Sequence, residues 1–320
     1  GQYSSCSISF AVIEYAVDGV FFNYNNNMQT GLAATVENTV IRYNTNGIHV
    51  YNYSAPQITA NQLYENTRAL YVHHNTLDSS FGGAYPIVTG NEFFDNHQWN
   101  YFTENMRSRT QTPMKIDATG NWWGTSDPLA IAEKIYDAFD PDDYDPTGFR
   151  PIVDFGHALD SAGGAAMQVY VNETIDSNLI LSGKVYVVGE LSVATGFSLS
   201  LSSSTEVMFF EGASLTVNGD ISVAADPNNP VLFIPVEPTA SRSYWNGVRI
   251  SSSSLIADID GCFISNASRA FEFDNASGSI SNCVITNNDV GVYIFDNNPS
   301  LDSVVSLTGN LIAVSYTHLR

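Results

Sequence analysis

Three observations predict an all-β fold in which two tandem parallel β-helices flank one short α-helix. Asparagines, each followed by a short apolar segment, recur 23, 30 and 30 residues apart at Asn38, Asn61, Asn91 and Asn121. Short alternating strands, separated by Gly, Ser and Asn turns, fill both halves of the chain. One stretch after Pro128 instead has apolar residues at helical spacing. Turn residues at fixed places in a repeat of this length mark a solenoid, in which each repeat is one coil.

The first array is expected over residues 1–160. When its coils are superposed, five apolar residues fall in one column: Ile13, Ile41, Leu63, Phe93 and Trp123. Parallel strands on successive coils are about 4.8 Å apart, so this column predicts a stacked core. We expect the asparagines to lie at tight turns, because Asn tolerates left-handed backbone angles and its amide can bond to the next Asn or to turn backbone.

An amphipathic helix is predicted over about 128–139. Asp127 is a suitable N-cap, and Pro128 suits the first helical position. The apolar residues that follow at helical spacing are Ala130, Ile131, Ile135, Ala138 and Phe139. A solenoid has an open end whose interior needs a cover, so the helix is interpreted as a lid. Residues 161–166 are rich in Gly and Ala, and we expect a linker there.

The second array is expected over residues 167–313, truncated at its end. The segments 261–266 and 282–287 repeat with a period of 21, which places Cys262, Cys283 and Asn310 in one column. Neighbouring coils would hold the two cysteines about 5 Å apart, within the range for a disulfide. A buried ladder of free thiols fits the same column and is the favoured alternative, because small polarisable side chains suit it.

These features resemble the right-handed parallel β-helix proteins of the pectin-lyase-like superfamily, including the periplasmic nitrous-oxide-reductase maturation type. The resemblance covers nearly the whole chain to Ala313. It is carried by the Asn-headed coils ending in 121–128 with the helix after them, and by 187–223 followed by 245–250. It implies right-handed coils. The superfamily includes lyases, hydrolases, epimerases, adhesins and scaffolds, so membership leaves the function open.

The final segment breaks the repeat pattern. Residues Val314 to Arg320 resemble a translated sequencing-library adapter and are left out of the fold prediction. We therefore expect the natural protein to continue with more coils of the same chain beyond both ends.

Composition limits the partners. The chain has 33 acidic and 12 basic residues and a net charge of −21, which argues against binding nucleic acid. It has no apolar run of about 18 residues, so no membrane insertion is expected in this fragment. The abundance of uncharged polar residues favours an extracellular, cell-surface or periplasmic location.

An outward aromatic stripe is the candidate carbohydrate-binding surface. It comprises Phe21, His49, Tyr71 and Tyr101, flanked by Tyr51 and His73. Aromatic faces at even spacing suit the C–H faces of pyranose rings, while neighbouring polar groups bond to the hydroxyls. Stacked outward rings also stabilise parallel sheets by themselves, and this alternative is favoured.

Two metal sites are considered and disfavoured. The acidic run Asp140, Asp142, Asp143 and Asp145 offers oxygen ligands for Ca²⁺, but it lacks the Gly and Glu of an EF-hand loop, so a solvated loop is preferred. His73 and His74 lack a third ligand, and only one of two adjacent strand residues can point outward. No cofactor is therefore expected.

The resulting functional prediction is a secreted or cell-surface protein that is not a catalyst. It would serve as a scaffold, an adhesin or a carbohydrate-contacting module, with a polysaccharide or surface glycan as partner. The alternative is a polysaccharide lyase or glycoside hydrolase. No two carboxylates fall on adjacent coils of one face in the first array, so the catalytic coils of such an enzyme would lie in the second array or outside this chain.

Overall fold

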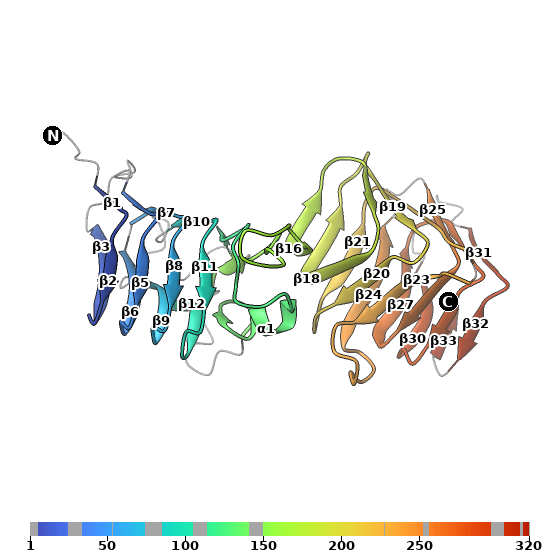
Figure 1. Ribbon diagram of the computed structural model, residues 1–320. Helices are drawn as coiled ribbons and strands as arrows, with labels where there is room; N and C mark the ends of the chain where they lie inside the picture. Colours follow the sequence, from blue (N-terminus) through green and yellow to red (C-terminus); the bar gives the residue numbers. More distant parts are fainter. Residues whose placement is uncertain are drawn as a thin grey trace. The chain divides into compact units, whose positions relative to one another are not determined.

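The structure is a computed structural model that describes residues 6–24, 34–52, 54–73, 85–104, 114–140, 150–226, 228–251, 256–295, 304–313 and 316–319. The chain divides into two compact units, Gly1–Met167 and Gln168–Arg320. Almost every described element is a strand, and all the named strands pair in parallel (Figure 1). The prediction of an all-β, parallel, solenoid-like fold is confirmed at this level.

In the first unit, successive coils add strands to three parallel sheets (Figure 1). The first sheet contains β1 (Ser7–Ser9), β4 (Thr35–Glu37), β7 (Gln57–Thr59) and β10 (Ile87–Thr89). The second contains β2 (Val12–Glu14), β5 (Val40–Arg42), β8 (Gln62–Tyr64) and β11 (Glu92–Phe94). The third contains β3 (Asp18–Tyr24), β6 (Asn46–Asn52), β9 (Arg68–His73), β12 (Trp99–Glu104) and β14 (Ile135–Tyr136). A further pair is β13 (Lys115–Asp117) with β15 (Ile152–Asp154).

The predicted core column of the first unit is confirmed. Ile13, Ile41, Leu63 and Phe93 are register partners on successive strands of the second sheet. The rings of Phe93 and Trp123 stack with centroids 4.7 Å apart. Alternating inward residues of short strands thus fill the interior, as a stacked parallel solenoid requires.

The asparagine column is right for three of its four members. Thr39, not Asn38, occupies the first place, because the first two of these coils are 22 residues apart and not 23. The Oδ1 atom of Asn91 accepts the backbone N–H of Asn61 at 3.0 Å, and that of Asn121 accepts the N–H of Asn91 at 2.8 Å. Each amide therefore satisfies buried turn backbone on a neighbouring coil.

A second asparagine ladder, absent from the prediction, supports the turn between the second and third sheets. The Oδ1 atom of Asn66 accepts the N–H of Asn44, and that of Asn96 accepts the N–H of Asn66, both at 3.0 Å. All three side chains are buried. The first unit is thus held at two of its corners by columns of buried amides.

The helix after the last coil is shorter than predicted. Asp127 is its N-cap, accepting the N–H of Leu129, and proline occupies the start as expected. The helix α1 ends at Ala132, and Ile135–Tyr136 form β14, which pairs with β12. The apolar spacing that extended the prediction to 139 belongs in part to this strand. The role of α1 as a lid stays a prediction.

Residues 161–166, predicted as a linker, form a tight turn. A single antiparallel bridge joins Leu159 to Ala166, and the N–H of Asp160 donates to the carbonyl of Ala165 at 2.8 Å.

The second unit contains two parallel sheets. The larger comprises β16 (Gln168–Ile175), β18 (Lys184–Val193), β20 (Glu206–Phe209), β21 (Ser214–Val217), β23 (Val231–Pro235), β24 (Trp245–Ser251), β26 (Cys262–Ser265), β27 (Ala267–Asp274), β29 (Val284–Thr286), β30 (Val290–Phe295), β32 (Leu311–Ala313) and β33 (Tyr316–Leu319). The smaller comprises β17 (Leu179–Leu181), β19 (Ser198–Ser202), β22 (Asp220–Ala224), β25 (Ala257–Asp260), β28 (Gly278–Ser281) and β31 (Val305–Thr308). The backbone of β33, within the adapter-like segment, pairs with β30.

A buried tryptophan anchors the interior of the second unit. Trp245 is fully buried and stacks on Phe209 with ring centroids 3.8 Å apart. Its Nε1–H donates to the carbonyl of Ser265 at 2.8 Å, which satisfies the one polar atom of the indole side chain.

Candidate functional site

The third sheet of the first unit carries a continuous column of outward rings, which we call the aromatic column. Its members lie on β3, β6, β9, β12 and β14 and are Phe21, His49, Tyr71, Phe102 and Tyr136. Successive ring centroids are 4.8, 4.5, 5.7 and 4.9 Å apart. This regular spacing follows from the parallel register, which places one side chain per strand at the same height.

Tyr101 is not part of this column, although the sequence predicted it there. It pairs with Leu70 on β9, and its side chain is fully buried in the interior. Asn96 is 30 residues after Asn66, whereas Tyr101 is 31 residues after Leu70. One extra residue between these two points moves the strand by one position, and a shift of one residue turns every side chain to the other side of a sheet.

A row of polar and aromatic groups, the distal row, borders the aromatic column on one side. It consists of Asn23, Tyr51, His73 and Glu104. The rings of Tyr51 and His73 have centroids 5.2 Å apart. The same one-residue shift places Glu104 here, and its carboxylate accepts a hydrogen bond from the Tyr71 hydroxyl. The predicted flanking residues Tyr51 and His73 therefore do lie beside Phe21, His49 and Tyr71.

The other border, the proximal row, was missed by the sequence analysis. It consists of Asp18, Asn46, Arg68 and Trp99. The Oδ1 atom of Asp18 accepts the Nδ2–H of Asn46 at 2.8 Å and lies 3.2 Å from Nδ1 of His49. The guanidinium of Arg68 lies 4.5 Å from the ring centroid of Phe102, in cation–π range.

Neighbouring side chains cover the middle of the aromatic column. The side chain of His49 is 13% exposed and Tyr71 is 8% exposed, whereas Phe21 is 49% exposed. Burial and the hydrogen bond to Glu104 raise the pKa of the Tyr71 hydroxyl, so it stays protonated and donates. A ligand could reach the ring of Phe21 and the partly exposed groups of both rows, but little of the Tyr71 ring.

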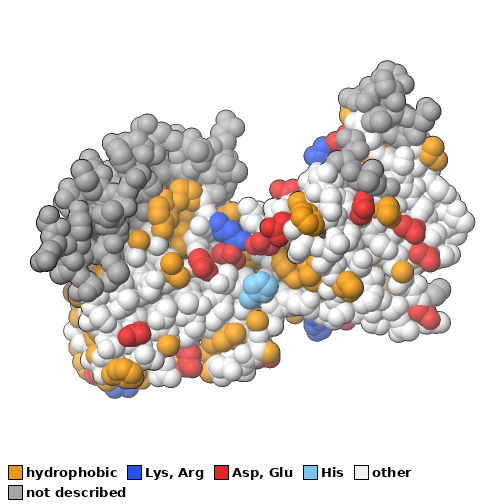
Figure 2. Space-filling view, turned by 90° about the horizontal axis from the view of Figure 1, so that it is seen from above, with side chains coloured by type: hydrophobic (Ala, Val, Ile, Leu, Met, Phe, Trp, Pro, Cys, Tyr) orange, Lys and Arg blue, Asp and Glu red, His pale blue; other side chains and the backbone are white. Residues whose placement is uncertain are grey.

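Acidic side chains are more common than basic ones on the face turned to the viewer in Figure 2, where both lie among hydrophobic side chains and the white atoms of other side chains and the backbone. In the aromatic region, Asp18 and Glu104 each have a polar partner, Asn46 and Tyr71 respectively. The site therefore presents two hydrogen-bonded carboxylates and a guanidinium beside aromatic rings. These charged groups can exchange hydrogen bonds with hydroxyl groups of a ligand.

The candidate metal ligands, which the sequence disfavoured, are only partly within the described residues. His73 lies in the distal row, and His74 lies outside the described residues, as do Asp142, Asp143 and Asp145. Asp140 accepts the N–H of Asp137 at 2.9 Å. Within the described part of the chain, no three His, Cys, Asp or Glu side chains are grouped to share a metal ion. The described part also has no helix of the length and hydropathy needed to span a bilayer.

Cys262 and Cys283 lie side by side in the second unit. Both are buried, and their Sγ atoms lie 2.8 Å apart. Asn310 continues the column, its Oδ1 accepting the N–H of Cys283 at 2.9 Å. Burial raises the pKa of the Cys262 thiol. The favoured thiol ladder and the alternative disulfide both fit this placement, and the choice between them stays a prediction.

The distance between two carboxylates is relevant to the alternative function, a glycoside hydrolase. In the aromatic region, Asp18 and Glu104 are three strands apart, which by itself separates them by about 14 Å, and they also lie in different rows along the strands. That distance exceeds the roughly 5 to 9.5 Å between the two acids of glycosidases. In the second unit, Asp258 and Asp260 lie two residues apart on β25, roughly 7 Å along one strand. Ser279 and Ser281 donate to them, respectively.

Comparisons with protein-family models, with curated proteins and with solved structures give no match to this chain. The stacked parallel sheets define the class of protein as a parallel solenoid.

Proposed function

We propose that this chain is a carbohydrate-contacting, non-catalytic module of a secreted or cell-surface protein, built as right-handed β-helices of the pectin-lyase-like kind. The aromatic column and its two bordering rows would form the contact surface. A polysaccharide or surface glycan would be the partner. The stacked parallel sheets support the solenoid part of this proposal, and the composition supports the location.

The observation that carries the proposal is that accessible aromatic rings and hydrogen-bonding groups lie side by side on one sheet. Phe21 offers an accessible ring, and Tyr51 and His73 add partly exposed rings beside it. Asp18 and Glu104 are carboxylates held in place by Asn46 and Tyr71. Sugar rings present an apolar C–H face and a rim of hydroxyls, so they match a surface of this mixed kind.

The buried rings also give structural support. Tyr71 is stacked on His49 and largely covered, so the centre of the aromatic column stabilises the sheet through contacts between neighbouring strands. A rigid spacer needs only the stability that the covered rings provide. A glycan-contacting surface also needs the accessible groups at the edges, so replacing those groups distinguishes the two functions.

The test is a polysaccharide array followed by calorimetry on the strongest ligand. Tyr51→Ala and His73→Ala should each weaken binding by about tenfold, the loss expected for one ring contact. The matched control is Tyr64→Ala, which removes an outward ring from the second sheet and should leave affinity unchanged. If the wild-type protein binds no polysaccharide on the array, the proposal is overturned, and the role of a rigid spacer remains.

The second candidate function is a glycoside hydrolase or lyase, and the pair Asp258 and Asp260 favours it. Their separation along β25 falls in the range used by glycosidase acids. Incubation with neutral and acidic polysaccharides, followed by assays for reducing and unsaturated ends, tests this function. Product formation that disappears in both Asp258→Asn and Asp260→Asn would replace the non-catalytic proposal with an enzyme.

A further inference from the structure

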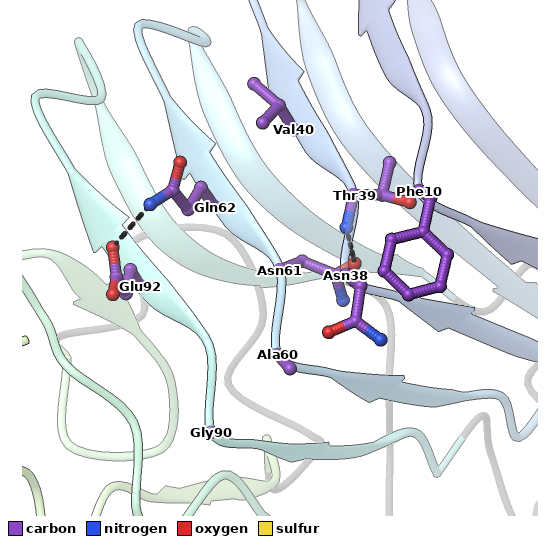
Figure 3. A pocket seen from close by; sticks show the side chains of 9 residues that line it. All are labelled: Phe10, Asn38, Thr39, Val40, Ala60, Asn61, Gln62, Gly90 and Glu92. Carbon is purple, nitrogen blue, oxygen red and sulfur yellow. Dashed lines mark hydrogen bonds between the residues drawn. The ribbon is translucent and has the colours of Figure 1, made fainter. Parts of the chain in front are cut away.

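A groove runs along the corner between the first and second sheets of the first unit (Figure 3). Its volume is about 360 Å³, within the range of small-molecule sites. The corner residues Asn38, Ala60 and Gly90 contribute to its lining, together with Gln62 and Glu92 of the second sheet. The groove thus lies on different sheets from the aromatic column.

The groove arises from a graded column of corner residues. From the first coil onwards these residues are Phe10, Asn38, Ala60, Gly90 and Gly120, and all have left-handed backbone angles, with φ between 50° and 67°. Their side chains become smaller along the series, which leaves space above the later corners. A Cβ atom added at Gly90 would meet only the Ala60 nitrogen, at 3.9 Å, so the space there is open.

Fixed polar groups form the walls. The Nε2–H of Gln62 donates to Oε2 of Glu92 at 3.0 Å (Figure 3). Beneath them, Oδ1 of Asn61 accepts the N–H of Thr39 at 3.0 Å and belongs to the buried ladder. The floor is therefore rigid, while the wall presents an amide and a carboxylate on adjacent coils.

Phe10 marks one end of the groove. The residue is 84% exposed, and its φ of 52° is unusual for a bulky residue, because the left-handed region crowds the Cβ atom. Such a conformation costs about 1 to 3 kcal/mol. In Figure 3 its ring lies beside Asn38, at the opposite end of the lining from Gln62 and Glu92.

We propose that this groove binds a neutral oligosaccharide lying along the solenoid axis. One sugar would stack on Phe10, and the hydroxyls of the next would bond to Asn38, Gln62 and Glu92. The carboxylate of Glu92 and the net charge of −21 disfavour a uronate chain. The proposal rests on the same ligand class as the proposed function, but it assigns a second site that does not require the aromatic column.

The test fills the groove without straining the fold. Asn tolerates the left-handed region and already occupies it at Asn38. Ala60→Asn and Gly90→Asn, combined in one variant, therefore project side chains into the groove at little cost to stability. The matched control is Ala60→Gly, which suits the same backbone angles and leaves the groove open. Calorimetry with cellohexaose, mannohexaose and xylohexaose, and with hexagalacturonate, measures the affinities.

At least one neutral hexasaccharide should bind the wild type more tightly than hexagalacturonate. The double variant and Phe10→Ala should each weaken that binding at least tenfold, while Ala60→Gly should not change it. Tyr51→Ala and His73→Ala should also leave it unchanged, since they test only the aromatic region. The proposal is wrong if no neutral hexasaccharide binds, or if binding survives in the filled variant. Loss of binding in Tyr51→Ala alone would place the ligand on the aromatic column instead.

Discussion

Tyr101 shares a register position with Leu70, and its phenol ring points into the interior of the first unit with its hydroxyl unpartnered among the described residues. Burial raises the pKa of this hydroxyl, so it is neutral, but it still lacks a hydrogen bond. A buried polar atom without a partner costs stability.

Tyr101→Phe should therefore stabilise the first unit by about 1 kcal/mol, because it removes the hydroxyl and keeps the ring. Tyr101→Ala should destabilise it by roughly 3 to 5 kcal/mol through the cavity left behind. Urea unfolding followed by fluorescence, with hydrogen exchange to assign the transition to the first unit, measures both changes. A less stable Tyr101→Phe protein would show that the hydroxyl has a partner in solution.

Replacing Asn91, in the asparagine ladder, should lower stability far more than replacing Asn38, in the corner column. Asn91 is fully buried and its amide bonds to two neighbouring coils, so Asn91→Ala should cost roughly 3 kcal/mol or more by leaving buried N–H and C=O groups unsatisfied. Asn38→Gly should change stability by only a few tenths of a kcal/mol, because an exposed left-handed position suits glycine. Thermal denaturation of the two variants provides the comparison, and equal losses would contradict the assignment of Thr39 to the ladder.

The stability of the first unit should fall as the pH rises from about 4 to about 7. Burial raises the pKa of Asp137 from 3.8 to about 7, although the N–H groups of Phe139 and Val153 bond to its carboxylate. Asp140 also raises this pKa and Arg150 lowers it. Because the folded state binds the proton more tightly than the unfolded chain, stability is greatest below pH 4 for this group and is lost through pH 7.

The shift corresponds to roughly 4 kcal/mol at most, from about 1.4 kcal/mol per pKa unit. Urea midpoints measured at pH 5 and pH 8 for the wild type and Asp137→Asn test this expectation. The wild type should lose more stability between the two conditions than the variant does. An equal loss in both proteins would assign the pH dependence to other groups.

Thiol titration distinguishes the two interpretations of the cysteine column. Cys6 is exposed, whereas Cys262 and Cys283 are buried. With a thiol ladder, the native protein should show one reactive thiol with Ellman's reagent, and the protein unfolded without reductant should show all three. A single thiol after unfolding would establish the disulfide. Cys6→Ser, which should show no native reactivity, controls for partial exposure of the other two.

The sequence predicted the elements that depend on local pattern. The column from Ile13 to Phe93 follows from apolar alternation, and the start of α1 follows from Asp127 and Pro128, so both appear in the structure as expected. The predicted end of α1 was wrong because Ile135 belongs to a strand that pairs with β12. The spacing of apolar residues along the chain does not show a pairing between coils.

The candidate site was harder to predict because it depends on register. A single extra residue before Tyr101 exchanged that ring for Phe102 and brought Glu104 next to Tyr71. The second asparagine column shows where the extra residue lies. Asn66 and Asn96 are 30 residues apart, whereas the strand partners Leu70 and Tyr101 are 31 apart, so the register changes between Asn96 and Tyr101. Trp99 could not be assigned to the proximal row without that correction.

The asparagine ladder gives the first unit a direction and a unit of length. Asn91 accepts from the coil before it and donates to Asn121 on the coil after it. Asn121 instead donates to the carbonyl of Val88 on the coil before it and to the carbonyls of Ala118 and Thr119 in its own turn. A whole coil inserted before Asn121 with asparagine at the same position would leave every amide bonded. The first unit can thus be lengthened one coil at a time, by about 4.8 Å per coil, and the turn at Asn121 would still end each longer version.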